Sequence, residues 1–164
     1  MEIERKFLIV RMPEHLEQYE NREIEQGYLC SDPVVRIRKS NEAYYMTYKS
    51  RLNMKENPED IALTCEEVEL PLTKEAYLHL RNKTDYHLVT KTRYLIPITG
   101  SYTAELDVFH GDLEGLIFAE VEFPDTEEAA LFVPPDWFGK DVSFDKRYKN
   151  NYLASIESLE EFKH

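Results

Sequence analysis

The sequence is poor in cysteine, glycine and tryptophan and has no long apolar run. Its 164 residues include only 2 Cys, 5 Gly and 1 Trp. Cys30 and Cys65 are too few for a disulfide scaffold and lack the paired spacing of a zinc site. No apolar stretch approaches the roughly 18 residues of a membrane-spanning helix. We therefore expect a cytoplasmic protein with no secretory signal and no membrane partner.

Basic residues are also few: the chain has 20 Lys and Arg but 32 Asp and Glu, which gives a net charge of −12. A nucleic-acid binder normally carries a basic face, so we expect no nucleic-acid partner. An acidic protein can still bind a small anion if its basic groups gather in one cavity and a divalent cation neutralises part of the ligand. The position of these basic groups therefore decides the class of function.

Several catalytic motifs are missing. The sequence has no Gly-rich phosphate loop ending in Lys-Ser/Thr, no dinucleotide fingerprint and no nucleophile elbow. Trp137 fits a core aromatic better than a base-stacking platform. The histidines are scattered without zinc spacing and fit surface or structural positions: His15, His79, His87, His110 and His164. The remaining candidates for chemistry are carboxylates, lysines and arginines.

Period-2 patterns dominate the first two thirds of the chain and predict strands. We expect eight, at about residues 1–10, 22–30, 34–40, 43–51, 61–70, 86–97, 102–109 and 115–123. Turns are expected at 40–42, 99–100 and 110–112. Helices are expected at 73–83 and at 125–132. A third helix is expected from Lys146 onward, because apolar residues repeat there at helical spacing: Tyr148, Tyr152, Ile156 and Leu159. These elements predict an α+β fold in a single domain, residues 1–164: a closed eight-stranded antiparallel β-barrel with helices packed outside.

Charged residues in these strands recur at i, i+2 and therefore project from one face of each strand. The sets are Glu2, Glu4 and Lys6; Arg36 and Arg38; Lys49; Glu67 and Glu69; Lys91 and Arg93; Glu105 and Asp107; Glu120 and Glu122. A solvated outer face is the ordinary explanation for any one pair. However, the pairs after the first set are segregated by sign, whereas like charges placed together repel each other. Because charge appears on almost every strand, we expect the charged face to line the lumen of the barrel.

A lumen with acidic and basic groups suits a metal–polyphosphate site. Carboxylate oxygens are preferred ligands of Mg2+ and Mn2+, and Arg and Lys suit phosphate oxygens. Phosphoryl transfer requires mainly positioning and charge stabilisation, so no covalent nucleophile is needed. The pattern therefore predicts a metal-bound polyphosphate chain, a small anion, as the ligand.

The ordered charge sets resemble a known family. Glu2-Ile3-Glu4-Arg5-Lys6 is similar to the Glu-x-Glu-x-Lys signature of the CYTH domain, or triphosphate tunnel metalloenzyme, superfamily. The remaining sets follow in the family's order, and the segment 141–150 resembles the family's C-terminal pattern. The resemblance covers essentially the whole chain and is strongest for short bacterial tripolyphosphatase-like members. It implies an eight-stranded tunnel and a divalent cation, Mg2+ or Mn2+.

The resemblance also assigns roles to the charged residues. It implies a principal metal site of Glu2, Glu4 and Glu122, with Asp107 and Glu120 available for a second ion. Supporting carboxylates would be Glu67, Glu69 and Glu105. The phosphates would be held by Lys6, Arg36, Arg38, Lys49, Lys91 and Arg93. Catalytic roles would fall to Lys91, Lys6 and Tyr28, although a strand tyrosine such as Tyr28 is as often a core residue.

Metal-dependent hydrolysis of a triphosphate, above all of inorganic tripolyphosphate to diphosphate and phosphate, is the activity that the resemblance favours. Two alternatives share the fold: a class IV-type adenylyl cyclase, which would need a base pocket, and a thiamine triphosphatase, which would need aromatics at the tunnel mouth. A non-catalytic sensor of polyphosphate or nucleotide is an alternative of another class. The sequence leaves the oligomeric state, the number of metals and the water-activating group open.

Overall fold

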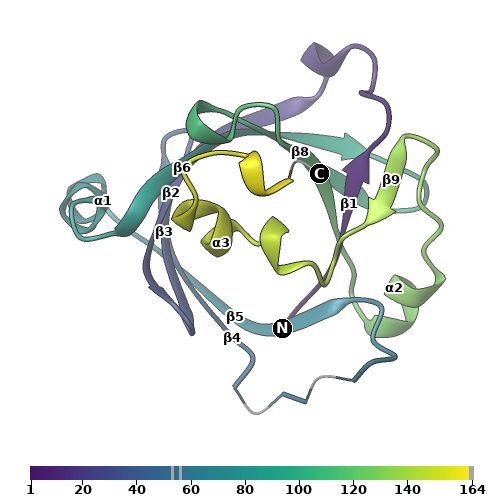
Figure 1. Ribbon diagram of the computed structural model, residues 1–164, viewed down its shortest axis with the longest axis horizontal. Helices are drawn as coiled ribbons and strands as arrows, with labels where there is room; N and C mark the ends of the chain where they lie inside the picture. The colour runs from purple at the N-terminus through teal and green to yellow at the C-terminus, as the bar shows by residue number, and fades with distance from the viewer. Residues whose placement is uncertain (53, 56, 163–164) are drawn as a thin grey trace.

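The computed structural model describes residues 1–162 except 53 and 56, and its centre is a closed antiparallel β-barrel (Figure 1). The strands are β1 Glu2–Ile9, β2 Glu20–Ser31, β3 Val34–Ser40, β4 Ala43–Ser50, β5 Leu63–Pro71, β6 Asp85–Pro97, β7 Thr103–Phe109, β8 Ile117–Glu122 and β9 Phe138–Asp141. The order β5-β4-β3-β2-β6-β7-β8-β1 is closed by pairing of β5 with β1. The predicted eight-stranded barrel is therefore confirmed, with strand ends within a few residues of those expected.

Alternation along the strands separates the lumen from the outer surface. On β3, Arg36 and Arg38 face the lumen side, whereas Ile37 between them is completely buried on the outer side under the first helix. On β1, the outward Arg5 donates to the carbonyl oxygen of Ala129 and forms an ion pair with Asp141 at 3.0 Å. Apolar positions such as Ile37 lie on the outer face and are buried where other elements cover it, whereas Val68 and Leu70 on the outer face of β5 stay exposed. The charged positions between them turn inward.

The ninth strand was not predicted from the sequence. β9 lies beside the second half of β1, where Phe7 faces Asp141 and Ile9 faces Phe138. Its four residues are too short for a period-2 signal. Gly139 allows the close approach, because a Cβ there would meet Val10 Cγ1 at 2.8 Å. As a result, β1 pairs with β5 through Glu2–Glu4 and with β9 further along.

Two helices lie where the sequence places them. α1 (Lys74–Arg81) begins after Thr73, whose hydroxyl accepts from Ala76 N, and α2 (Thr126–Leu131) begins after Asp125, whose carboxylate accepts from Glu128 N. Such side-chain caps satisfy amide groups that the first helical turn leaves unpaired. The expected turns are also present, and Asn41, Gly100 and Gly111 adopt positive φ in them. Within the described residues, no helix is long and apolar enough to cross a membrane.

The expectation of a continuous C-terminal helix is wrong. The segment forms a 3-10 turn at Lys146–Tyr148, α3 at Asn150–Ser155 and a second 3-10 turn at Glu160–Phe162. Lys149 and Ile156 are extended and interrupt the helix. The breaks let Tyr148, Leu153 and Ile156 pack on one apolar cluster, so tertiary packing overrides the helical periodicity.

Two aromatic-rich cores support the barrel. One lies between β1, β8, β9 and α2 and includes Phe7, Phe123 and Phe132. In the other core, Phe109 of β7 and Phe118 of β8 pack against the C-terminal segment. Looking along the barrel, α3 projects onto the centre of the ring (Figure 1). The C-terminal segment therefore covers one end of the barrel, while α1 and α2 lie against its outside.

Candidate active site in the barrel lumen

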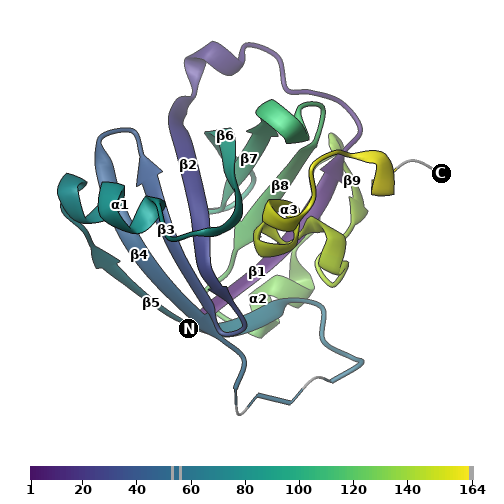
Figure 2. The same ribbon diagram turned by 60° about the vertical axis from the view of Figure 1, so that its left-hand side comes forward.

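The register of the strands that form the barrel wall, which Figure 2 shows as a ribbon, brings predicted site residues together. Register places Glu4 opposite Glu122 and Lys6 opposite Glu120 on β1 and β8. It also places Lys49 opposite Glu67 on β4 and β5, and Arg93 opposite Asp107 on β6 and β7. Side chains on the same face of directly opposed residues are neighbours. The i, i+2 sets of the sequence thus form one charged lining.

Carboxylates dominate the lumen near the start of β1. Glu2 accepts from Lys49 Nζ at 2.8 Å, and Glu2 and Glu67 share a side-chain hydrogen bond. Burial and this hydrogen bond raise the pKa of Glu67 to about 7. Burial and the nearby carboxylates of Glu120 and Glu2 raise the pKa of Glu4 well above its usual value. Negative charge in this region is therefore only partly compensated by the protein's own cations.

This donor set was tested for its fit to a divalent cation. The groups are hard carboxylate oxygens, which suit Mg2+ or Mn2+ rather than softer metals. Burial, with repulsion from neighbouring carboxylates such as Glu2, raises the pKa of Glu4 and Glu122, and a cation among these three groups would relieve that repulsion. In the described part of the chain, no three His, Cys, Asp or Glu side chains already converge as a metal cluster. The donor chemistry fits a hard divalent cation, and Glu2, Glu4 and Glu122 are the residues that would hold it.

A compact ion-pair network lies deeper in the lumen. Asp107 is completely buried and accepts from Lys91 Nζ at 2.8 Å and from Arg93 Nε at 2.8 Å. Arg93 also pairs with Glu105 at 2.5 Å. Burial raises the pKa of Asp107, but the two cations outweigh it and hold the pKa below its usual value. Both Asp107 oxygens are engaged, so its predicted role at a second metal ion stays a prediction.

Lys91 combines complete burial with a crowded cationic environment. Burial, with Arg93 and Arg38 nearby, lowers the pKa of Lys91 to about 7 against the attraction of Asp107. Its Nζ also donates to Asn150 Oδ1 at 3.1 Å, which brings α3 to the lumen. An amine with such a pKa exchanges protons near neutral pH.

Arg36 and Arg38 differ from the other lumen cations. Neither has an ion pair with a carboxylate among the described residues. Arg36 Nη2 donates to Thr47 Oγ1 at 3.1 Å, while its buried Nε has no partner within the described chain. Burial, with Arg36 and Arg93 nearby, lowers the pKa of Arg38 to about 9. Two guanidinium groups thus hold uncompensated positive charge beside the carboxylate-rich region, an arrangement suited to phosphate.

Lys6 joins the lumen to the C-terminal segment. Its Nζ donates to the carbonyl oxygen of Tyr148 at 2.6 Å and pairs with Glu120 at 3.5 Å. Burial raises the pKa of Glu120, but the surrounding cations, above all Lys6 and Arg93, hold it well below its usual value. The segment 143–150 therefore closes the lumen near Lys6 and Lys91. The remaining predicted residue, Glu69, contacts Thr47 Oγ1 at 3.3 Å.

Tyr28 belongs both to the core and to the site. Its ring is 2% exposed and packs in the aromatic cluster beneath the C-terminal segment, as the core interpretation expects. Its hydroxyl accepts from Gln26 Nε2 at 3.1 Å. No hydrogen bond joins Tyr28 to Lys91 in the described structure, and its catalytic role stays a prediction.

Three polar residues of the lumen were missed in the sequence. Gln26 and Thr47 are completely buried and hold Arg38 and Arg36. Both lie two residues before a recognised position, Tyr28 or Lys49, so the same period-2 rule could have identified them. Asn150 carries no such signal, because the break before α3 determines its position.

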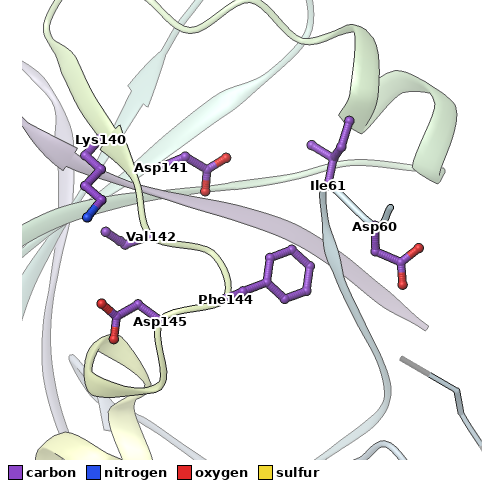
Figure 3. Close-up of a pocket in the computed structure, with 7 residues that line it drawn as sticks. All are labelled: Asp60, Ile61, Lys140, Asp141, Val142, Phe144 and Asp145. Atoms are coloured by element: carbon purple, nitrogen blue, oxygen red, sulfur yellow. The ribbon is translucent and has the colours of Figure 1, made fainter. Parts of the chain in front are cut away.

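Two cavities open at the surface of the described structure. One, of about 360 Å3, is bordered by Ile61, Phe144 and neighbouring residues of the β9 strand, and its side chains are shown in Figure 3. The other, of about 410 Å3, includes Tyr102 with Glu105 and Glu122 at the carboxylate-rich mouth. The first contains none of the predicted site residues, and the second marks the entrance to the lumen.

The site's order of residues matches a family model, that of the CYTH domain, across residues 1–146. The chain belongs to the CYTH family. Curated relatives support the assignment. This CYTH protein is 37% identical over 156 residues to an inorganic triphosphatase of Nitrosomonas europaea, covering 93% of this chain and 96% of that protein. It is also 37% identical over 131 residues to an inorganic triphosphatase of Acetivibrio thermocellus, covering 79% of this chain and 78% of that one.

Solved structures agree with the barrel of this CYTH protein. A crystal structure of an inorganic triphosphatase superimposes with a TM-score of 0.68 at 35% identity, covering 96% of this chain and 97% of that chain. A candidate adenylyl cyclase from Hippeastrum, described as having a dominant triphosphatase activity, gives a TM-score of 0.61 at 14% identity, covering 79% of this chain and 83% of that one. The second likeness shows the fold alone.

Proposed function

We propose that this CYTH protein hydrolyses inorganic tripolyphosphate to diphosphate and phosphate with Mg2+ or Mn2+. The observation that carries the proposal is the pair of guanidinium groups on β3, of buried Arg36 and half-buried Arg38, without carboxylate partners among the described residues. They share one lumen with the repelling carboxylates of Glu2 and Glu4. Its inorganic triphosphatase relatives, which match over most of the chain, support the same reaction.

In this proposal the basic residues bind the phosphates and the acidic residues bind the metal ion. Arg36 and Arg38 hold phosphate oxygens, with Lys49 and Arg93 adding positive charge along the chain of the substrate. Glu2, Glu4 and Glu122 would hold the principal ion, which would supply charge neutralisation and polarisation of the scissile phosphoryl group. Asp107 and Glu120 are the candidates for a second ion, and Glu67, Glu69 and Glu105 orient the cations around them.

Lys91 is the group that we assign to proton transfer. Its pKa of about 7 leaves a neutral fraction at neutral pH, and Nζ of that fraction can accept a proton from the attacking water. Lys6, fixed by Tyr148 and Glu120, places a second amine in the lumen. Positioning and charge stabilisation supply the remainder of catalysis.

The test is phosphate release from tripolyphosphate, ATP and thiamine triphosphate, each with Mg2+, with Mn2+ and with chelator. We expect metal-dependent release that is fastest from tripolyphosphate. The ATP reactions are also assayed for cyclic AMP, and its formation in place of phosphate would show an adenylyl cyclase instead. Tight metal-dependent binding of tripolyphosphate without turnover would show a sensor.

Two wider expectations belong to this proposal. We place the protein in the cytoplasm, where its free thiols, Cys30 and Cys65, would stay reduced. We also treat residues 1–164 as one functional domain, because the site draws on strands from β1 to β8 and on the C-terminal segment.

A further inference from the structure

Gln26 is completely buried on the lumen side of β2 and bridges two site residues. Its Oε1 accepts from Arg38 Nε at 2.9 Å and from Arg38 Nη2 at 2.7 Å. Its Nε2 donates to the Tyr28 hydroxyl at 3.1 Å. A guanidinium group can only donate, so Arg38 determines which end of the amide is the oxygen. The amide nitrogen is therefore directed at Tyr28.

The partner of Arg38 is neutral, as is the Thr47 hydroxyl that holds Arg36, whereas the lysines of the lumen have carboxylate partners. Lys49 is paired with Glu2, and Lys91 is paired with Asp107, each at 2.8 Å. A carboxylate fixes a cation but also cancels its charge. An amide oxygen fixes the guanidinium through two hydrogen bonds and leaves its charge for an incoming anion. A fixed, charged fork is what bidentate phosphate recognition requires.

The same amide constrains the Tyr28 hydroxyl. Because Gln26 Nε2 donates to it, the hydroxyl oxygen acts as acceptor in that contact and keeps its own proton for another partner. A carboxylate at position 26 would reverse this arrangement, since it can only accept. It would accept a hydrogen bond from the Tyr28 hydroxyl and pair with Arg38 at the same time.

We propose that Gln26 is a positioning residue for the triphosphate site. It orients Arg38 for phosphate without neutralising it, and it leaves the Tyr28 proton free to be donated into the lumen. This inference rests on the proposed function, because it assigns Arg38 to the phosphate chain. It extends that function by explaining why the site places a glutamine among carboxylates.

The Gln26→Glu variant tests the charge argument. We expect its affinity for tripolyphosphate, measured by calorimetry with Ca2+ in place of Mg2+, to fall at least about tenfold. We expect its melting temperature without ligand to stay equal or rise, because the introduced carboxylate forms an ion pair with Arg38. Gln18→Glu makes the same charge change at an exposed position, and it should alter neither quantity. Wild-type affinity in Gln26→Glu would overturn the inference, as would a loss of affinity that Gln18→Glu reproduces.

A double-mutant cycle tests whether Gln26 acts through Arg38, and it remains decisive if Gln26→Glu does not fold. We expect Gln26→Met and Arg38→Met each to weaken tripolyphosphate binding, with the double variant no weaker than Arg38→Met alone. Additive losses would overturn the inference. The wild-type protein separates the two proposals: if it binds no tripolyphosphate, both are wrong. If it binds and turns over tripolyphosphate but the cycle is additive, only the role of Gln26 is wrong.

Discussion

At the scale of single residues, the lumen is defined by which charges are compensated and which are not. Asp107 is held by two cations, whereas Glu4 has other carboxylates as its main neighbours. Arg36 and Arg38 are held by hydroxyl and amide oxygens instead of carboxylates. Uncompensated groups of opposite sign in one lumen are poised for a ligand that carries both a metal ion and phosphates.

Glu4→Gln should separate activity from stability. We expect metal-dependent turnover to fall by about two orders of magnitude or more, as a metal ligand and its charge are lost. At pH 7 without metal, the melting temperature should stay equal or rise, because the charged form of Glu4 is disfavoured in the fold. Phosphate release and thermal melts measure the two effects. Glu66→Gln, at an exposed position of β5, is the matched control and should change neither.

Glu67 should make the stability of the metal-free protein depend on pH. Its folded pKa of about 7 lies above its unfolded value, so the folded state binds more protons between the two. The contribution of Glu67 to the free energy of unfolding is therefore fully present at low pH and is lost as the pH rises through about 7. Melting temperatures with chelator from about pH 5 to about pH 8 should show this decline, and Glu67→Gln should reduce it. An unchanged slope in the variant would assign the decline to another group.

At the scale of elements, α1 is attached to the barrel by a polar contact on the outer surface. Glu25 on β2 accepts from Tyr77 Oη at 2.8 Å and from Arg81 Nε at 2.7 Å. Tyr77 is 1% exposed, and its ring lies 5.2 Å from that of Tyr44 on β4. These contacts cover the outer face of β3, whose inner face holds Arg36 and Arg38.

Removing this contact should loosen α1 without touching the lumen. We expect Glu25→Gln to lower the free energy of unfolding by about 1 kcal/mol, since a partly exposed charged hydrogen-bond pair contributes on this order. Urea denaturation measures the loss. Glu42→Gln, in the exposed β3–β4 turn, should be neutral. A reduction in turnover larger than the loss of stability explains would contradict the view that α1 only supports the wall.

The elements also show what the sequence can and cannot predict. The charged i, i+2 sets predict the barrel and its lining because one face of each strand must be buried against covering elements. Gln26 and Thr47 carry no charge, so the charge pattern does not reveal them. β9 is positioned by its fit against β1 near Gly139, and the breaks at Lys149 and Ile156 follow from packing on the barrel end. Such long-range fits leave no local pattern.

At the scale of the whole molecule, the ligand and the metal should stabilise the folded barrel as a unit. The site takes side chains from all eight barrel strands, so a bound ligand joins parts that are far apart in the sequence. Binding to the folded state alone adds about 2.7 kcal/mol at a ligand concentration of about one hundred times the dissociation constant. Such a contribution is large compared with the net stability of a single domain.

Tripolyphosphate should therefore raise the melting temperature. We expect a rise of roughly 5–10 °C at saturating tripolyphosphate with Ca2+, used as a slowly reacting ion in place of Mg2+. The variant Arg36→Met/Arg38→Met should lose most of this rise while keeping its ligand-free melt close to that of the wild type. Scanning calorimetry measures both. Equal stabilisation of variant and wild type would remove the two arginines from the binding site.

The position of β1 has a consequence for synthesis of the chain. β1 pairs with β8, which begins at Ile117, along one edge, and with β9, which begins at Phe138, on part of the other edge. Apart from the stretch Glu2–Glu4 that pairs with β5, its edges therefore stay unsatisfied while most of the protein is being made. An unpaired strand is a template for aggregation unless charges interrupt it. Glu2, Glu4 and Lys6 supply such charges on alternate residues. The carboxylates assigned to the metal site would thus also act as gatekeepers on the nascent chain, before any barrel exists to contain them.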